Sequence, residues 1–241
     1  MTQQIKHCEP LDILVIGAHP DDAEIGMGAT IAKHTAAGFR VGICDLTYAE
    51  LSSNGTVDGR QAEAAQAAAA LGLAARSVLG LPDRGLSVTA EHVAAITAAI
   101  RRYRPKVVFA PYWRDRHPDH VACSHLVKEA VFNAKLRRYL PELQAVAIES
   151  LYYYFINDVY EPNLVVDVTS VYSQKETALR AYTSQFTTLA GGGNIVPTPL
   201  NQGYLERVEA RDRLLGQTIG SAYAEGFVQA QPYQVDLFGF A

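Results

Sequence analysis

Two short polar clusters hold the residues of this sequence that could do chemistry. The first, HPDDAE, places His19, Asp21 and Asp22 directly after an apolar run. The second, DRHPDH, places His117 and His120 three residues apart in another polar stretch. Adjacent carboxylates repel one another, and a carboxylate taken out of water raises the free energy unless something pairs with it. The first cluster therefore calls for a compensating positive charge.

A divalent metal ion would supply that charge. Two imidazoles and one carboxylate from two loops form the donor set of a catalytic zinc site with open coordination positions. The cation would also offset the repulsion between Asp21 and Asp22. One of these aspartates can bind the metal, and the other can take a proton from metal-bound water, whose pKa falls to about 7 on zinc. Either motif alone could instead be a strand-to-helix turn in which an aspartate caps the helix.

The segments around these clusters alternate between strands and helices. Strands are predicted at 11–18, 39–47, 75–81, 106–112, 149–156 and 163–169, and helices at 24–38, 60–73, 89–105, 121–136, 170–186 and around 201–224. This order predicts an α/β fold with a Rossmann-like, doubly wound, mostly parallel sheet and helices on both faces. We expect a single domain over 1–241, with a β/α core at 1–136, a C-terminal elaboration at 137–241 and a Gly/Pro/Thr-rich loop at 187–203.

The fold class predicts where the two clusters meet. Ligands of open parallel sheets bind outside the carboxyl ends of the strands. HPDDAE follows the strand 11–18, and DRHPDH follows the strand 106–112. These strands are neighbours in one common strand order of this fold class, so we expect both clusters to face one crevice.

Composition argues against several classes of function. A net charge of −4 without a basic stripe argues against nucleic-acid binding. The apolar runs are too short to span a membrane, and the N-terminal residues lack the pattern of a secretory signal. Three cysteines, far apart and odd in number, do not predict a disulfide framework. We therefore expect a cytoplasmic protein without membrane or nucleic-acid partners.

Three motifs resemble one family. AHPDDAE, the loop AELSSNG followed by Arg60, and DRHPDH resemble the LmbE-like, or PIG-L-like, metal-dependent N-acetylglucosamine deacetylases. The likeness extends to YYYFINDVYEPNLVVDVT and to YLERVEARDRLLGQTIGSAYAEGF. Within the family, the chain most resembles the bacillithiol biosynthesis deacetylases, which act on N-acetylglucosaminyl-malate. The resemblance implies a hydrolase of a small-molecule N-acetylglucosaminide that forms homo-oligomers, often hexamers.

The resemblance also implies roles for single residues. It implies metal ligands at His19, Asp22 and His120. Asp21 matches the general base, and His117 matches a histidine that stabilises the oxyanion or protonates the leaving amine. The proton donor stays open between Asp21 and His117. Asp119 lies where a carboxylate can orient a histidine. The implied metal is Zn²⁺, although the same ligands accept Fe²⁺.

Three further residues are implied to bind substrate. Arg60 matches an arginine that holds the substrate, and its planar guanidinium suits the malate carboxylate. Arg116 is a second candidate for that task. Tyr204 matches a tyrosine that closes over the substrate in relatives.

Other functions stay open at this point. The substrate could be another N-acetylated sugar, such as free N-acetylglucosamine, a chitooligosaccharide or a natural-product glycoside. A two-histidine, one-carboxylate set also suits a non-haem iron oxygenase, although those sites usually lie on β-barrels. A third possibility is a non-catalytic protein that binds a sugar or a metal on the same fold.

Overall fold

One sheet forms the centre of the molecule in the computed structural model, which describes residues 9–187 and 195–232. Its strands are β1 (Ile13–Gly17), β2 (Val41–Asp45), β3 (Ala75–Val78), β4 (Val107–Pro111), β5 (Ser150–Tyr154), β6 (Leu164–Asp167) and β7 (Ala224–Gln229). Over the described ranges the strand order is β3-β2-β1-β4-β5-β7-β6. The pairs from β3 to β5 are parallel, whereas β7 is antiparallel to both β5 and β6. This arrangement confirms the predicted mostly parallel sheet.

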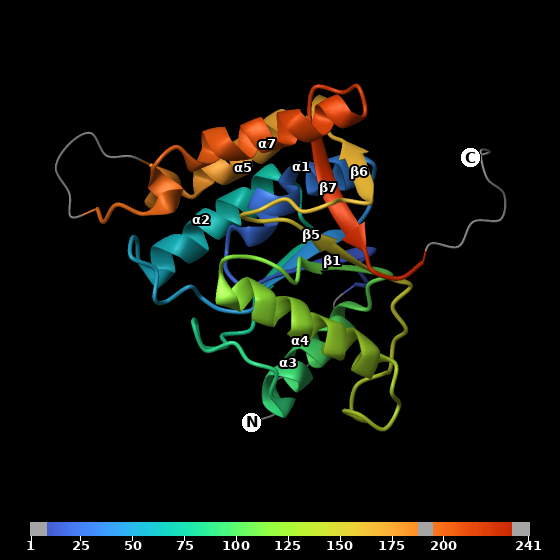
Figure 1. The fold of residues 1–241 in the computed structure, drawn as a ribbon. Coiled ribbons are helices and arrows are strands. Elements are labelled where there is room, and N and C mark those ends of the chain that lie inside the picture. Colours follow the sequence, from blue (N-terminus) through green and yellow to red (C-terminus); the bar gives the residue numbers. More distant parts are fainter. Residues whose placement is uncertain (1–8, 188–194, 233–241) are drawn as a thin grey trace.

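Helices cover both faces of this sheet, as predicted. They are α1 (Asp22–Ala36), α2 (Val57–Ala70), α3 (Ala90–Tyr103), α4 (Pro118–Ala134), α5 (Tyr172–Ala181), α6 (Thr183–Phe186) and α7 (Tyr204–Thr218), with 3₁₀ turns η1 (Thr169–Val171) and η2 (Pro199–Asn201). Figure 1 shows α3 and α4 on one face and α1, α2, α5 and α7 on the other. In the described part of the chain, no helix is long and apolar enough to cross a membrane.

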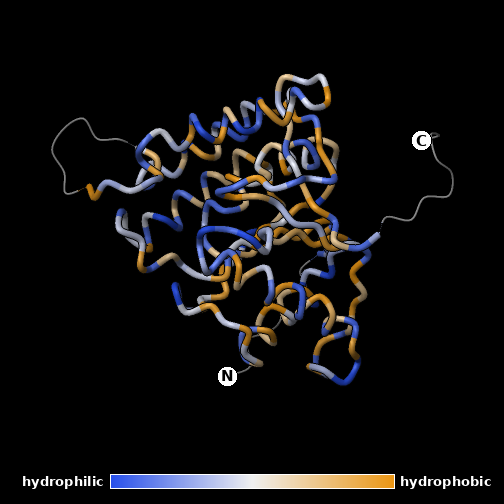
Figure 2. Tube along the Cα trace, viewed as in Figure 1, coloured by the Kyte–Doolittle hydropathy of each residue, from blue (hydrophilic) through white to orange (hydrophobic). Residues whose placement is uncertain are grey.

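The central strand β1 explains why both faces are covered. Its alternate side chains enter two separate cores. Ile13 and Val15 pack with residues of α1 and α2, whereas Leu14 and Ile16 pack with residues of α3 and α4. A strand buried on both faces reads as a continuous apolar run. Figure 2 shows apolar segments running through the middle of the molecule.

Some elements differ from the sequence prediction. β7 is not predicted, because its sequence AEGFVQ contains a buried Glu225 and a glycine and therefore lacks a strand-like apolar pattern. α7 ends at Thr218 rather than near residue 224, shortly before Gly220, which has a φ of +72°. The helix expected at 170–186 is divided into η1, α5 and α6. Residues 188–194 of the expected loop 187–203 lie outside the described residues.

Candidate metal centre and active site

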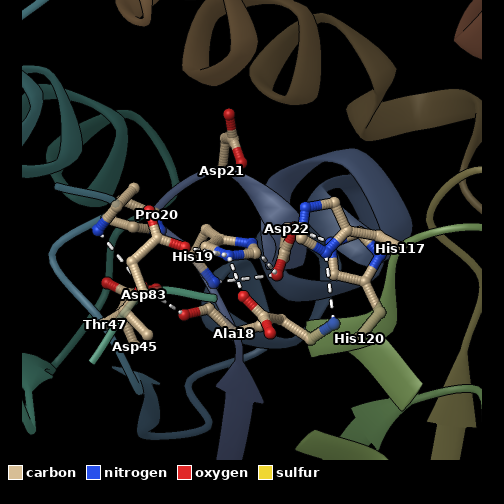
Figure 3. Close-up of polar contacts among 12 residues, drawn as sticks. Ala18, His19, Pro20, Asp21, Asp22, Asp45, Thr47, Asp83, His117 and His120 are labelled. Atoms are coloured by element: carbon tan, nitrogen blue, oxygen red, sulfur yellow. Dashed lines mark hydrogen bonds and ion pairs between the residues drawn. The ribbon is translucent and has the colours of Figure 1, made fainter. Parts of the chain in front are cut away.

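The first polar cluster lies in the tight turn between β1 and α1. A Cβ atom on Gly17 would lie 3.2 Å from Cβ of Asp22, so a larger residue would crowd the turn. Asp21 has a φ of 112°, a left-handed conformation that non-glycine residues rarely adopt. This turn separates two adjacent carboxylates: Figure 3 shows Asp22 among the imidazoles and Asp21 standing apart from them.

The second cluster lies at the start of α4, directly after β4. Nδ1 of His117 accepts a hydrogen bond from the backbone N–H of Asp119 over 3.2 Å and so caps the helix. Pro118 follows at the first helical position, where a missing N–H costs nothing. His120 then lies in the first turn of α4. Because β1 and β4 are neighbours, the two clusters meet at one edge of the sheet.

Asp22 lies between two of the histidines. Its Oδ1 atom is 3.1 Å from Nε2 of His120, and its Oδ2 atom is 3.5 Å from Nδ1 of His19. The ring of His117 stacks on His120, with 4.6 Å between the ring centroids. Nitrogen atoms of the three imidazoles lie within 4.8 Å of one another. The structure thus brings together the three residues predicted as metal ligands, with His117 beside them (Figure 3).

The outer nitrogens of His19 and His120 face carboxylates. Nε2 of His19 is 3.2 Å from Oδ1 of Asp83 and 3.3 Å from Oδ2 of Asp119. Nδ1 of His120 is 3.0 Å from Oδ1 of Asp115. Such partners fix the orientation of a metal-binding imidazole and increase its basicity. Asp119 was predicted for this position, whereas Asp83 and Asp115 were not.

The two missed carboxylates share one sequence feature, their position after a parallel strand. Asp83 follows β3 in the loop PDRG, and Asp115 lies in the DRHPDH motif after β4. Both therefore lie beyond the carboxyl ends of parallel strands, where ligands of this fold class bind. No local pattern separates them from ordinary loop aspartates, because their partners come from other loops.

The charges of this cluster favour a bound cation. Burial lowers the pKa of His120, but Asp22 and Asp115 outweigh it and raise that pKa to about 9. Burial likewise lowers the pKa of His19, and its carboxylate partners raise it well above the usual value. Burial raises the pKa of Asp22, yet His120 and His19 hold it well below its usual range. Two imidazoles thus sit where positive charge is stabilised, so the donor set fits a divalent metal ion.

The carboxylate of Asp21 has a different environment. It is buried and pairs with Arg60, whose Nη1 donates to Oδ2 of Asp21 over 2.8 Å. The same nitrogen donates to the backbone oxygen of Pro20, and Nη2 donates to Ser52. Burial raises the pKa of Asp21 to about 7, against the opposing charge of Arg60. A carboxyl group with a pKa near neutrality is suited to proton transfer.

One cavity of about 270 Å³ connects these groups. Its walls include eight of the nine predicted site residues: His19, Asp21, Asp22, Arg60, Arg116, His117, His120 and Tyr204. The ninth, Asp119, is buried behind His19. Arg116 is exposed and has no hydrogen bond or ion pair among the residues that the structure describes. The hydroxyl of Tyr204 donates to Oδ1 of Asn157 over 3.1 Å.

Known proteins match both the sequence and this fold. Residues 14–131 match the PIG-L family, GlcNAc-PI de-N-acetylase. The diacetylchitobiose deacetylase of Thermococcus kodakarensis is 33% identical over 72% of this chain and 70% of its own. A 1D-myo-inositol 2-acetamido-2-deoxy-α-D-glucopyranoside deacetylase of Saccharopolyspora erythraea is 30% identical over 71% of this chain and 82% of its own.

A solved structure covers nearly the whole chain. The conserved protein TT1542 of Thermus thermophilus is 39% identical, with a TM-score of 0.86 over 96% of this chain and all of its own. The similarity in sequence and the similarity in fold therefore extend over most of this chain. The chain belongs to the PIG-L family, GlcNAc-PI de-N-acetylase, and the two relatives from Thermococcus kodakarensis and Saccharopolyspora erythraea are N-deacetylases, hydrolases that cleave an amide bond.

Proposed function

We propose that the protein is a metal-dependent hydrolase that removes the N-acetyl group of an N-acetylglucosamine conjugate. The observation that carries this proposal is the single cavity that holds three imidazoles, the carboxylate of Asp22 and the separate carboxylate of Asp21. Amide hydrolysis needs a polarised carbonyl, an activated water molecule and a proton for the departing amine. The residues that line the cavity include groups suited to all three tasks.

His19, Asp22 and His120 would hold the metal. We propose Zn²⁺, and the same ligand set also suits Fe²⁺. When bound, the ion supplies a Lewis acid that lowers the pKa of a water molecule and polarises the acetyl carbonyl. The carboxylates of Asp83, Asp115 and Asp119 would keep the two imidazoles in position.

Asp21 and His117 would perform the proton chemistry. Asp21 takes a proton from the attacking water and passes it to the amine as acetate leaves, since its pKa lies near neutrality. Nδ1 of His117 accepts the N–H of Asp119, so the ring proton of neutral His117 lies on Nε2. That N–H can donate to the carbonyl oxygen as negative charge develops there.

The proposed substrate is N-acetylglucosaminyl-malate of bacillithiol biosynthesis. Arg116 offers a guanidinium without a partner in the described ranges, which suits a malate carboxylate. Arg60 offers the N–H groups that its bonds to Pro20, Asp21 and Ser52 leave free, and Tyr204 lines the same cavity. The relative named for diacetylchitobiose supports a second candidate, a neutral N-acetylated sugar.

Acetate release by the purified protein tests this proposal. N-acetylglucosaminyl-malate, N-acetylglucosamine and N,N′-diacetylchitobiose are compared before chelation, after chelation and after zinc is restored. We expect metal-dependent release that favours the malate conjugate. Release from neutral sugars alone would retain the reaction and reject the bacillithiol substrate. No release from any sugar, with zinc demonstrably bound, would reject catalysis in favour of a binding protein.

We also propose the domain organisation, the location and the oligomeric state of the protein. A single domain over 1–241, a cytoplasmic location and a homo-oligomeric, hexameric state follow from the resemblance and the sequence pattern. Light scattering of the purified protein measures the assembly, and a monomer would contradict it.

A further inference from the structure

Asn157 occupies a position between the metal cluster and the wall of the cavity. It follows the end of β5, the strand that pairs with β4 in the register Pro111 to Tyr154. The residues after β5 therefore run beside the loop that carries the DRHPDH motif. Asn157 donates to one residue of that loop through both its backbone and its side-chain amide, and Nδ2 also lies 3.5 Å from Nδ1 of His120. Its Nδ2 donates to Oδ1 of Asp115 over 2.8 Å, and its backbone N donates to Oδ2 over 3.2 Å.

Asp115 is in turn the residue that faces the outer nitrogen of His120. Its side chain is 4% exposed, and its Oδ1 atom lies 3.0 Å from Nδ1 of His120. The same oxygen accepts the backbone N–H of His117 over 2.7 Å. A carboxylate on Nδ1 leaves the Nε2 lone pair free, and that nitrogen points toward Asp22 at 3.1 Å. The direction of the His120 lone pair thus depends on where Asp115 is held.

The type of residue at position 157 fits this task. Asparagine offers N–H donors and a carbonyl acceptor on one short side chain. The donor side is used by Asp115, and Oδ1 accepts the hydroxyl of Tyr204 from α7 over 3.1 Å. The reverse orientation of the amide would place Oδ1 against the Asp115 carboxylate. Its two partners therefore fix the amide, which ties the cavity wall at α7 to the loop of the metal cluster.

We propose that Asn157 is a positioning residue of the metal centre, acting through Asp115 to aim His120. This inference rests on the proposed role of His120 as a metal ligand. Loss of a residue that orients a ligand typically lowers metal affinity by about 10- to 100-fold. Asn157→Ala removes the side-chain donor but keeps the backbone bond to Asp115. We therefore expect the smaller effect, a zinc dissociation constant raised about tenfold.

The test measures metal binding rather than turnover. Zinc affinity is determined by competition with a chromophoric chelator, and the absorption bands of the Co²⁺-loaded protein report the ligand geometry. Asn163→Ala is the matched control, because Asn163 is exposed and, in the described residues, its side chain bonds only to Gln229. We expect Asn157→Ala to weaken zinc binding and shift the Co²⁺ bands. The control should do neither, and the metal-free proteins should unfold at similar temperatures.

Two results would overturn the inference. Unchanged zinc affinity and Co²⁺ spectrum in Asn157→Ala would show that the contact to Asp115 does not position His120. A lower unfolding temperature with unchanged zinc affinity would leave Asn157 a purely structural role. A double variant gives a further check: in an Asp115→Asn background, Asn157→Ala should change zinc affinity by less than about twofold if the two act through one contact.

Failure of the Asn157 inference can be told apart from failure of the deacetylase proposal. If the parent chain binds zinc and loses it in His120→Ala, but releases no acetate from any sugar, the deacetylase proposal fails. The role of Asn157 would still stand on the affinity and the Co²⁺ spectrum.

Discussion

Asp21 combines three unusual properties in one residue. Its backbone has a φ of 112°, its carboxylate is buried, and its partner is Arg60. A left-handed conformation at a non-glycine residue costs about 1–3 kcal/mol, and such strain often occurs at functional sites. Here it turns Asp21 away from Asp22, so two neighbouring carboxylates can serve different tasks.

Replacing Asp21 with asparagine should separate metal binding from catalysis. Asparagine keeps the shape but cannot accept a proton, and general base catalysis typically contributes about 10²- to 10⁴-fold. We expect kcat/KM for acetate release to fall by about that factor. Zinc content, measured by elemental analysis, should stay at the parent level. Exposed Asp58→Asn serves as the control. Near-parent turnover in Asp21→Asn would reject the base assignment.

Removing the charge of Arg60 should change the pH dependence of the reaction. Burial raises the pKa of Asp21 to about 7, and Arg60 opposes that rise. A base acts only when deprotonated, so activity rises as pH passes upward through its pKa. Arg60→Gln should raise this pKa further and move the acid limb of the kcat/KM profile to higher pH. Exposed Arg137→Gln should leave the profile unchanged. If the midpoint of the acid limb stays unchanged or moves to lower pH in Arg60→Gln, the proposed effect of Arg60 on the pKa of Asp21 is contradicted.

At the scale of elements, α1 depends on distant parts of the chain. The helix is interrupted at Met27, which has φ −151° and ψ 24°. Glu225 from β7 accepts the freed backbone N–H groups of Ala29 and Thr30 over 3.1 and 2.6 Å. Lys175 from α5 then bridges Glu225 to Asp212 of α7, at 2.7 and 2.6 Å. The C-terminal elements thus hold the helix whose first residue is Asp22.

Breaking this buried network should destabilise the fold. Lys175 has no exposed surface, and its removal leaves the carboxylate of Glu225 without its cation and that of Asp212 with Arg211 alone. Removing one partner of a buried ion pair typically costs about 3–5 kcal/mol, so we expect that loss in the free energy of unfolding of Lys175→Met. Exposed Lys33→Met should cost less than about 1 kcal/mol. Urea unfolding followed by circular dichroism measures both, and equal losses would contradict the network's importance.

At the scale of the whole molecule, strand order creates the site. β1 and β4 are separated by most of the first half of the chain, yet they are neighbours in the sheet. Their carboxyl ends bring His19 and Asp22 to His120. A metal bound there would link two loops that lie far apart in the sequence.

Metal binding should therefore stabilise the folded protein. A ligand at 100 times its dissociation constant adds about 2.7 kcal/mol to the free energy of unfolding, if it binds only the folded state. Thermal unfolding with chelator and with zinc should show this difference. His120→Ala should abolish the zinc-dependent shift, whereas His125→Ala, an exposed histidine on the same helix, should retain it. Equal unfolding temperatures of the parent with and without zinc would contradict a metal site here.

The sequence by itself determined the features that depend on nearby residues. The apolar run before HPDDAE predicts the doubly buried strand β1, and helical spacing predicts α1 to α4. The two polar motifs at strand ends indicate the metal centre and the residues that line its cavity. The strand and helix predictions succeed because burial on both faces and helical periodicity depend on consecutive residues.

The tertiary structure alone decided which distant groups meet. Asp83 and Asn157 look like ordinary loop residues until strand order places them near His19 and Asp115. The strand β7 cannot be recognised from the sequence because it contains the charged residue Glu225. That carboxylate is accommodated by the break in α1, where it accepts two backbone N–H groups. Arg60 was predicted as a substrate ligand, and only packing reveals its bond to Asp21. Pairing across the sheet sets these contacts, and no local run of residues encodes them.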